Sequence, residues 1–175
     1  MEPYQIIILV ILLLLFLYVS AFLLIISNSI GFRRKLRKRA SALMVLVSEK
    51  QEILLAWFGL FAHEKIALSE EDKALLSSLK NINLDKPSPE EWIASLNLLK
   101  SAQMRLGFLS EESDLRGSLA EKKAYVSTLH DLDANYRQSS AVYNADVGAF
   151  NYWISIPGFS WLLYLLGFRK KTLLS

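Results

Sequence analysis

The sequence predicts an all-α protein in which one N-terminal transmembrane helix is followed by an elongated antiparallel bundle of three or four helices. Three observations predict this fold class. Residues 6–26 contain no charge, no Pro and no Gly over a length that fits a bilayer. Apolar residues then recur with the three–four spacing of amphipathic helices. No stretch of the sequence shows the alternation that is typical of a β-strand.

The apolar stretch 6–26 has the length of a transmembrane helix. At ~1.5 Å per residue it reaches ~30 Å, about the thickness of a hydrocarbon core. Tyr18 and Ser20 are its only polar side chains. A cleaved signal peptide is the alternative, because residues 19–21 resemble a cleavage site. Such a peptide has a basic N-terminal region and a shorter apolar stretch, so we expect an uncleaved span.

Basic residues flank only one end of the span. Residues 1–5 contain no Lys or Arg, whereas residues 33–39 contain six. These are Arg33, Arg34, Lys35, Arg37, Lys38 and Arg39. Lys and Arg beside a span stay on the cytoplasmic side, where anionic lipid attracts them, so we expect the N-terminus outside. A nucleic-acid patch is another interpretation of such a run, but its place directly after a span favours a topology signal.

Composition divides the chain into five segments. They are a short external N-terminus (1–5), the transmembrane helix (6–26), a basic juxtamembrane segment (27–39), a cytoplasmic helical body (40–156) and an aromatic and basic C-terminal segment (157–175). The residues after the span suffice for one domain with a modest core. Because the chain has no Cys, disulfides and thiolate metal sites are excluded.

Charge is unevenly distributed along the chain. Beyond the six cations of residues 33–39, three more of the 20 Lys and Arg lie near the C-terminus, at Arg169, Lys170 and Lys171. The other 11 accompany 16 of the 17 Asp and Glu, so the middle of the chain has a net charge of about −5. A weakly acidic body between two basic ends suggests that both ends face anionic lipid.

Capping signals and apolar spacing predict four helices after the span. We expect them over residues 33–68, 70–80, 89–107 and 113–156, with a loop over 81–87. Ser69 precedes an acidic first turn, and Ser88 and Glu91 form a capping box around a Pro at the first helical position. Residues 53–61 are too short to span a membrane and should be core. The 89–107 helix should bury Trp92, Ile93, Leu96, Leu99 and Leu106.

The last long helix carries an apolar seam. Nine of the twelve positions along one face are apolar or aromatic, and these positions are 115, 119, 122, 126, 129, 133, 136, 140, 143, 147, 150 and 154. A seam of ~60 Å needs partner helices along its length, which predicts a bundle. Tyr143, Val147 and Phe150 should therefore be buried.

Two aromatic–Asn pairs, Tyr143-Asn144 and Phe150-Asn151, lie one heptad apart on this helix. Asn is a poor helix former, so two of them within a helix indicate a tertiary role. An interhelical hydrogen bond that fixes the register is one interpretation. A partner-binding face is the other.

The segment 159–168, which follows Pro157-Gly158, is short, apolar and aromatic. It cannot span a bilayer, but Phe159, Trp161, Tyr164 and Leu165 could anchor it in the lipid interface. The alternative is that it plugs one end of the bundle. If the first cytoplasmic helix ends before residue 70, the last helix returns to the membrane, and we then expect this segment near residues 33–39.

The sequence contains no recognisable catalytic, metal or cofactor motif. The His63-Glu64 pair lacks the second His of a zinc-protease motif, because Ala67 occupies that position. His130 has too few companions for a metal site, and the Glu-x-x-His pairs of di-iron bundles are missing. Nucleophile elbows and phosphate-binding loops are also missing. We expect no enzyme, no cofactor, no small-molecule substrate and no nucleic-acid partner.

The C-terminal part of the chain contains a distinctive combination of residues. It comprises Tyr143, Asn144, Val147, Phe150, Asn151, Pro157, Gly167 and Phe168. Together with the N-terminal span and the Leu36-Arg37 and His63-Glu64 pairs, this pattern resembles the LemA family of bacterial membrane proteins over about residues 28–170. The resemblance implies an all-helical cytoplasmic domain tethered by one span to the bacterial cytoplasmic (inner) membrane. Members of that family have no settled molecular function.

These features predict a non-catalytic, membrane-tethered helical scaffold of LemA type. We expect self-association or other protein partners, in addition to the membrane and its anionic lipid. The alternative is an accessory or regulatory subunit of a membrane enzyme such as a protease.

Overall fold

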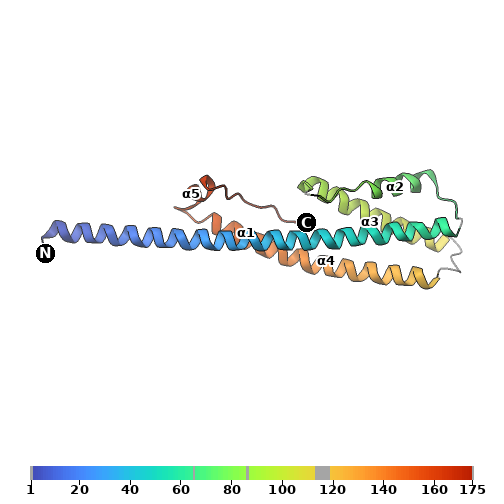
Figure 1. The fold of residues 1–175 in the computed structure, drawn as a ribbon, viewed down its shortest axis with the longest axis horizontal. Coiled ribbons are helices and arrows are strands. Elements are labelled where there is room, and N and C mark those ends of the chain that lie inside the picture. Colours follow the sequence, from blue (N-terminus) through green and yellow to red (C-terminus); the bar gives the residue numbers. More distant parts are fainter. Residues whose placement is uncertain (1, 65, 86, 113–118, 175) are drawn as a thin grey trace. The chain divides into compact units, whose positions relative to one another are not determined.

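The computed structural model describes residues 2–64, 66–85, 87–112 and 119–174, and this part of the chain contains helices and no strands. The helices are α1 (Pro3–His63), α2 (Glu70–Lys80), α3 (Pro89–Glu112), α4 (Leu119–Ile154) and α5 (Ser160–Leu165) (Figure 1). The prediction of an all-α protein with a long apolar N-terminal helix is therefore confirmed.

Helix α1 is longer than the sequence predicts. The span, the basic segment and the first part of the body form one continuous helix of 61 residues. No Pro follows Pro3 within it, and each of its two Gly, Gly31 and Gly59, costs only about 1 kcal/mol relative to Ala. The helix ends at His63 and not at the predicted Leu68, and α2 begins after its N-cap Ser69.

The chain forms two compact units. The first contains residues 1–39 and 142–174, and the second contains residues 40–141. Helices α1 and α4 each contribute one part to either unit.

The core of the first unit combines residues from both ends of the chain. Its buried members come from α1, α4 and the segment that includes α5, and they are Ile25, Leu36, Val147, Phe150, Ile154, Leu163 and Phe168. Val147 and Phe150 are buried as predicted, and Tyr143 is half-buried against the same cluster.

The core of the second unit draws on four helices. Its buried apolar residues are Leu43, Val47, Leu54, Trp57, Phe58, Phe61, Leu79, Trp92, Leu99, Ala102, Leu106, Leu109, Leu129 and Leu132. The prediction that residues 53–61 are core is confirmed for Leu54, Trp57, Phe58 and Phe61, whereas Ala56 and Gly59 are exposed. Ile93 and Val126 were predicted on buried stripes, but both are exposed. Ile93 lies ~100° around the helix from Trp92 and farther still from Leu99 and Leu106, so it faces away from the buried side of α3, and Val126 lies at the edge of the buried side of α4.

Capping residues set the helix starts in the second unit. The Asp72 backbone N–H donates to Ser69 Oγ, and the Ser69 backbone N–H donates to the Asp72 carboxylate, which is a capping box. Ser88 and Glu91 make the same reciprocal pair before α3. Gly107 was predicted to end α3, but the helix continues to Glu112, because an internal Gly only weakens a helix.

Helix α4 follows the prediction at one end. It stops at Ile154, just before Pro157, and Gly158 has the positive φ of 86° that a Gly adopts easily. Its predicted start near Ser113, and seam position 115, lie outside the described residues. Of the remaining seam positions, 129, 147, 150 and 154 are buried.

Candidate membrane-binding site

The N-terminal half of α1 exposes its apolar side chains. It is long and apolar enough to cross a membrane, and its most apolar stretch is not buried against other described residues. Every residue from Ile6 to Val19 is exposed. In water such a surface would be strongly unfavourable, whereas hydrocarbon would solvate it.

The segment after α4 returns to this half of α1. The Phe159 ring stacks on Tyr18 with ring centroids 4.7 Å apart, and on Phe22 at 5.9 Å. The Tyr18 hydroxyl donates a hydrogen bond of 3.1 Å to the Gly158 carbonyl oxygen. Figure 1 shows α5 lying alongside α1. Phe159 thus holds the segment on α1, although the sequence suggested it as a lipid anchor.

A compact C-cap ends α5 and directs the chain back. Gly167 has a φ of 80°, its N–H donates to the Tyr164 carbonyl, and the Phe168 N–H donates to the Leu163 carbonyl. This pair of bonds is the Schellman motif, and Leu163 and Phe168 supply its apolar contact in the core. The Leu-Gly-Phe sequence at 166–168 therefore ends one helix and fills the core.

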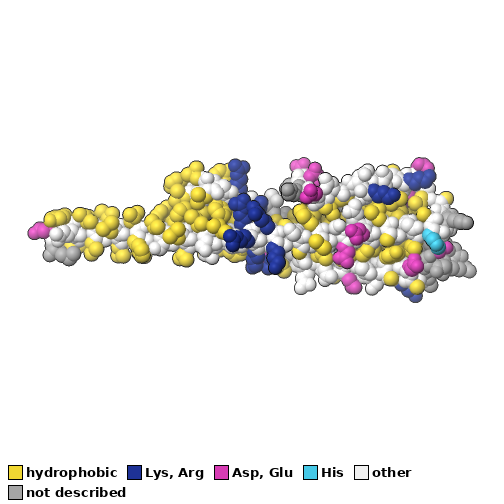
Figure 2. Space-filling model, viewed as in Figure 1, with side chains coloured by type: hydrophobic (Ala, Val, Ile, Leu, Met, Phe, Trp, Pro, Cys, Tyr) yellow, Lys and Arg dark blue, Asp and Glu magenta, His cyan; other side chains and the backbone are white. Residues whose placement is uncertain are grey.

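Cations gather where the exposed apolar surface of the first unit ends. The Arg33 guanidinium lies 6.0 Å from the centre of the Phe168 ring, and the Arg169 guanidinium lies 5.6 Å from that of Tyr164. Figure 2 shows Lys and Arg as a dark band beside the apolar surface. Most of the predicted topology cations are exposed, namely Arg33, Arg34, Lys35, Arg37, Lys38, Arg169, Lys170 and Lys171.

Two of the predicted topology cations also serve the fold. Arg39 Nε lies 2.6 Å from Asp146 Oδ2, and Lys35 Nζ lies 3.3 Å from Oδ1 of the same carboxylate. Asp146 is buried, so these cations compensate its charge. The pair fixes the basic segment of α1 against α4.

The two heptad-spaced Asn residues hold the C-terminal tail, which is residues 169–174. Asn144 Nδ2 donates to the Leu174 carbonyl at 2.6 Å, and the Leu174 N–H donates to Asn144 Oδ1 at 2.8 Å. Asn151 makes the same two bonds, both 2.9 Å, with the backbone of Lys171. Seven helical residues rise ~10.5 Å and three extended residues ~10 Å, so the two spacings match. The expected interhelical hydrogen bond is wrong: these amides bind an extended backbone.

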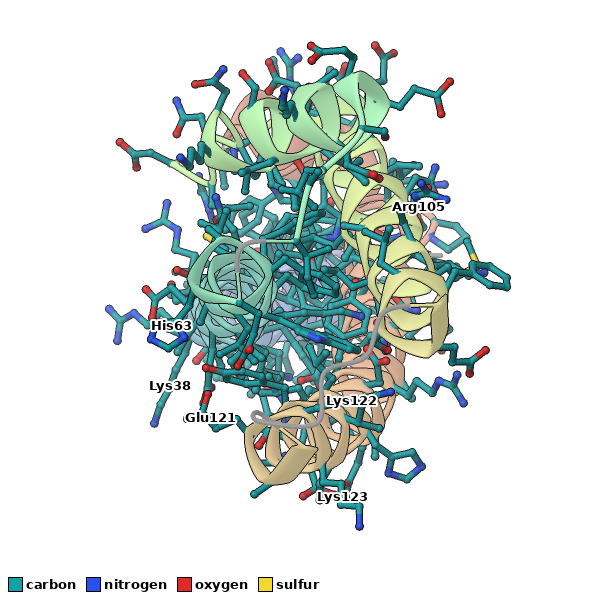
Figure 3. The ribbon with its side chains drawn as sticks, turned by 90° about the vertical axis from the view of Figure 1, so that its right-hand side faces the viewer. Lys38, His63, Arg105, Glu121, Lys122 and Lys123 are labelled. Carbon is teal, nitrogen blue, oxygen red and sulfur yellow. The ribbon has the colours of Figure 1, made fainter. Side chains whose placement is uncertain are left out.

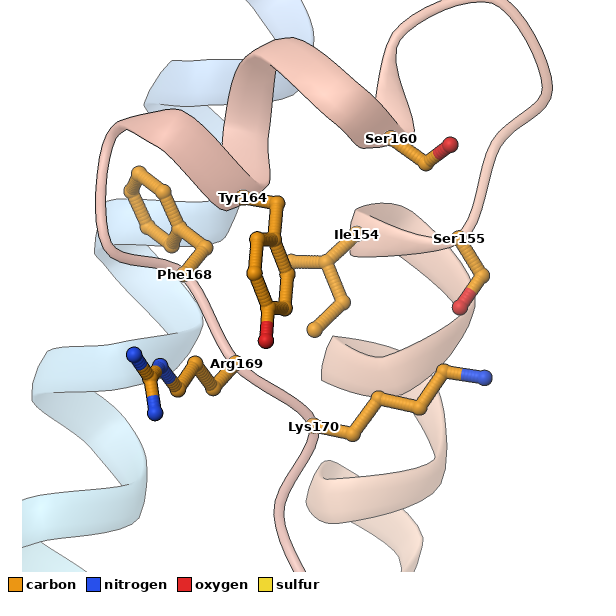
Figure 4. A pocket seen from close by; sticks show the side chains of 7 residues that line it. All are labelled: Ile154, Ser155, Ser160, Tyr164, Phe168, Arg169 and Lys170. Carbon is orange, nitrogen blue, oxygen red and sulfur yellow. The ribbon is translucent and has the colours of Figure 1, made fainter.

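A pocket of about 530 Å³ lies between α4, α5 and the tail. Figure 4 shows its lining residues, which are Ile154, Ser155, Ser160, Tyr164, Phe168, Arg169 and Lys170. Arg169 and Lys170 occupy one end, and the Tyr164 hydroxyl points toward that end. The pocket is thus lined by apolar, aromatic and hydroxyl side chains, with two cations at one end.

No family model, curated protein or solved structure matches this chain. The LemA resemblance therefore stays a prediction. The residues that carry it nevertheless have definite places in the first unit. Val147, Phe150 and Phe168 are core, Asn144 and Asn151 bind the tail, and Pro157 and Gly167 lie at the two ends of the segment that contains α5.

Two ion pairs join helices inside the second unit. Asp72, 1% exposed, accepts from Arg105 Nε at 2.6 Å and from Arg105 Nη2 at 3.2 Å. The Arg105 guanidinium holds the pKa of Asp72 below its usual value. Lys50 Nζ on α1 lies 2.6 Å from Asp133 Oδ1, so the polar residue at seam position 133 pairs with a cation of α1.

The residues considered for metal chemistry lie apart. His63 is exposed on the outside of α1 (Figure 3), and the His130 side chain is 85% exposed. Within the described ranges no three His, Asp or Glu side chains could together hold a metal ion.

The sequence carries a signal for the returning segment that simple span searching misses. Residues 147–168 contain no charged side chain, with Pro157-Gly158 near their middle. Neither the residues before Pro157-Gly158 nor those after it are long enough by themselves to cross a bilayer. Tyr18, the one large polar side chain of the span, marks the place on α1 that the turn contacts.

Proposed function

We propose that this chain is a non-catalytic, single-span membrane protein whose helical body acts as a scaffold for other proteins or for further copies of itself. The membrane holds it at two places, the apolar half of α1 and the segment that contains α5. This description agrees with a protein of LemA type in a bacterial cytoplasmic membrane.

The observation that carries the proposal is the meeting of two distant apolar segments beside one group of cations. Tyr18 contacts Gly158 and Phe159, and Arg33 contacts Phe168, so both ends of the chain present apolar surface on the same side of the basic residues. A hydrocarbon layer bounded by anionic headgroups has the same order of environments.

The orientation follows from the basic residues. With Arg33–Arg39 and Arg169–Lys171 on the cytoplasmic side, the N-terminus lies outside and the second unit lies in the cytoplasm. We further propose that the helices of the body form an antiparallel bundle. Two contacts support opposite directions for α1 and α4. Lys35 on α1 pairs with Asp146 on α4, whereas Tyr18, which lies earlier on α1, contacts Gly158, which lies later in the chain.

The scaffold role is supported by a contrast in the second unit between charged side chains that are paired within it and apolar side chains that are exposed. Asp72 with Arg105 and Lys50 with Asp133 are paired in ways that stabilise helix packing. Meanwhile Phe108 and Met104, one helical turn apart on α3, are exposed at 62% and 52%. An exposed apolar pair on a helix is suited to protein contact.

Photocrosslinking in intact membranes tests the scaffold role. A photoreactive phenylalanine analogue at Phe108 of the full chain should give discrete crosslinked species, either with a second copy or with a partner. Recurrent capture of one membrane enzyme would favour the accessory-subunit alternative. The same analogue at exposed Ala74 is the control. Absence of any adduct specific to position 108, together with a monomer in detergent, would contradict the scaffold proposal.

A further inference from the structure

We propose that residues 147–168 enter the bilayer as a re-entrant hairpin beside the apolar half of α1, from the side that carries the basic residues. The inference rests on the proposed membrane attachment and deepens it. The segment around α5 would then not lie on the lipid surface: α4 would enter the hydrocarbon, turn at Pro157-Gly158 and leave through α5.

The proposed hairpin has two arms, residues 147–156 and residues 159–168, and the distribution of charge defines their outer ends. Asp146 and Arg169 bound a run of 22 residues without a charged side chain. Both boundary residues lie with the cations of the basic segment: Asp146 pairs with Lys35 and Arg39, and Phe168, the neighbour of Arg169, contacts Arg33. Entry and exit are therefore at the same level of α1.

The depth of the turn can be measured along helix α1. Phe168 lies beside Arg33, whereas Gly158 and Phe159 lie beside Tyr18, 15 residues earlier. That interval corresponds to ~22 Å along a helix. Half of a hydrocarbon core is ~15 Å, so with the cations at the headgroups the turn would reach about the middle of the bilayer.

The backbone at the turn meets the requirement of a dry environment. Irregular backbone in hydrocarbon needs internal partners, because no water replaces them. The Ile156 carbonyl accepts from the N–H groups of Phe159 and Ser160, and the Gly158 carbonyl accepts from the Tyr18 hydroxyl. On the arm, the Asn151 side chain is satisfied by the backbone of Lys171.

The outward side chains of the hairpin are large and apolar. Tyr152, Trp161, Tyr164 and Leu165 are between 60% and 75% exposed, although Leu163 beside them is fully buried. One face of this segment is packed in the core, and the other face is exposed and apolar. Such a segment is suited to a position between protein and lipid.

Cysteine labelling in liposomes tests the hairpin, because the chain has no Cys of its own. The full-length Leu165→Cys and Leu173→Cys variants form a matched pair. Both replace a Leu, and both sites are exposed, at 75% and 61%. Protein packing therefore shields neither site, so a large difference in reactivity that vanishes in SDS reports shielding by lipid.

A charged maleimide is supplied on both sides of the membrane. We expect the Leu165→Cys variant to react at least roughly tenfold more slowly than the Leu173→Cys variant in liposomes, and equally fast in SDS. Equal rates in liposomes would overturn the hairpin. If the rates are equal while the protein stays in the membrane after alkaline washing, the single-span tether still holds. Release of the protein by that wash would contradict the tether itself.

Discussion

Asp72 illustrates how a buried charge in this chain is stabilised. Its carboxylate caps α2 through Ser69 and accepts two hydrogen bonds from Arg105 on α3. We expect Asp72→Asn to lower the free energy of unfolding by about 2 kcal/mol, because Arg105 keeps its charge but loses its partner. Thermal unfolding in detergent, followed by circular dichroism, measures the effect.

The control for Asp72 is Glu70→Gln. Glu70 pairs with Lys73 on the surface, with its side chain 89% exposed, so its loss should change stability by less than about 0.5 kcal/mol. Equal effects of the two substitutions would show that the buried pair has no special weight.

The same residue predicts a pH dependence. Because the folded-state pKa of Asp72 is lowered, its contribution to stability is present above the unfolded-state pKa and is lost as the pH falls. The unfolding temperature should therefore drop between about pH 5 and pH 2 more steeply for the native chain than for Asp72→Asn. Parallel profiles would contradict this assignment.

Asn144 and Asn151 give a prediction about the tail. Replacing both with Ala removes four hydrogen bonds to the backbone of Lys171 and Leu174. At about 1 kcal/mol per bond, amide exchange at these two residues should become roughly tenfold faster or more. Hydrogen-exchange mass spectrometry measures it, with exposed Asn97→Ala as the control. Unchanged exchange would mean that the tail is held by other contacts.

At the scale of the elements, α4 depends on its buried seam. Phe150 is 1% exposed within the core of the first unit. Phe150→Ala should cost about 3 kcal/mol or more, because it leaves a cavity between α1, α4 and α5. Tyr152→Ala, at a 69% exposed position of the same helix, should cost far less. Similar unfolding temperatures for both variants would contradict this packing.

Local signals in the sequence predicted most of the helices. Capping residues marked the starts of α2 and α3, and Pro157 marked the end of α4, because these act through hydrogen bonds within a few residues. The continuity of α1 was missed, because a change from apolar to basic side chains alters the surroundings of a helix and not its backbone. Gly107 misled for a related reason: a Gly ends a helix only where the chain must turn.

Long-range contacts explain what the sequence could not predict about the site. The heptad spacing of Asn144 and Asn151 indicated a tertiary role, but nothing in the spacing identifies an extended tail as their partner. The contact of Tyr18 with Gly158 joins residues 140 positions apart. A single sequence contains no signal for such a pair beyond the two residue types.

At the scale of the whole molecule, the fold of the first unit affects how membrane binding can be tested. Removing residues 1–32 would delete Phe22 and Ile25, and with them the face of α1 against which Phe159 packs. A truncated chain would therefore lose part of the core of the first unit along with the span. Point substitutions in the full-length chain avoid this problem.

Tryptophan quenching by lipids tests most directly the claim that the C-terminal segment and α1 share one membrane. The chain has four Trp, of which Trp161 lies on exposed α5 and Trp92 lies in the second unit. Full-length variants that keep one of these two, with Phe at the other Trp positions, are placed in liposomes of brominated phospholipid. We expect strong quenching of Trp161 and none of Trp92. Unquenched Trp161 emission in a protein that remains membrane-bound would contradict it.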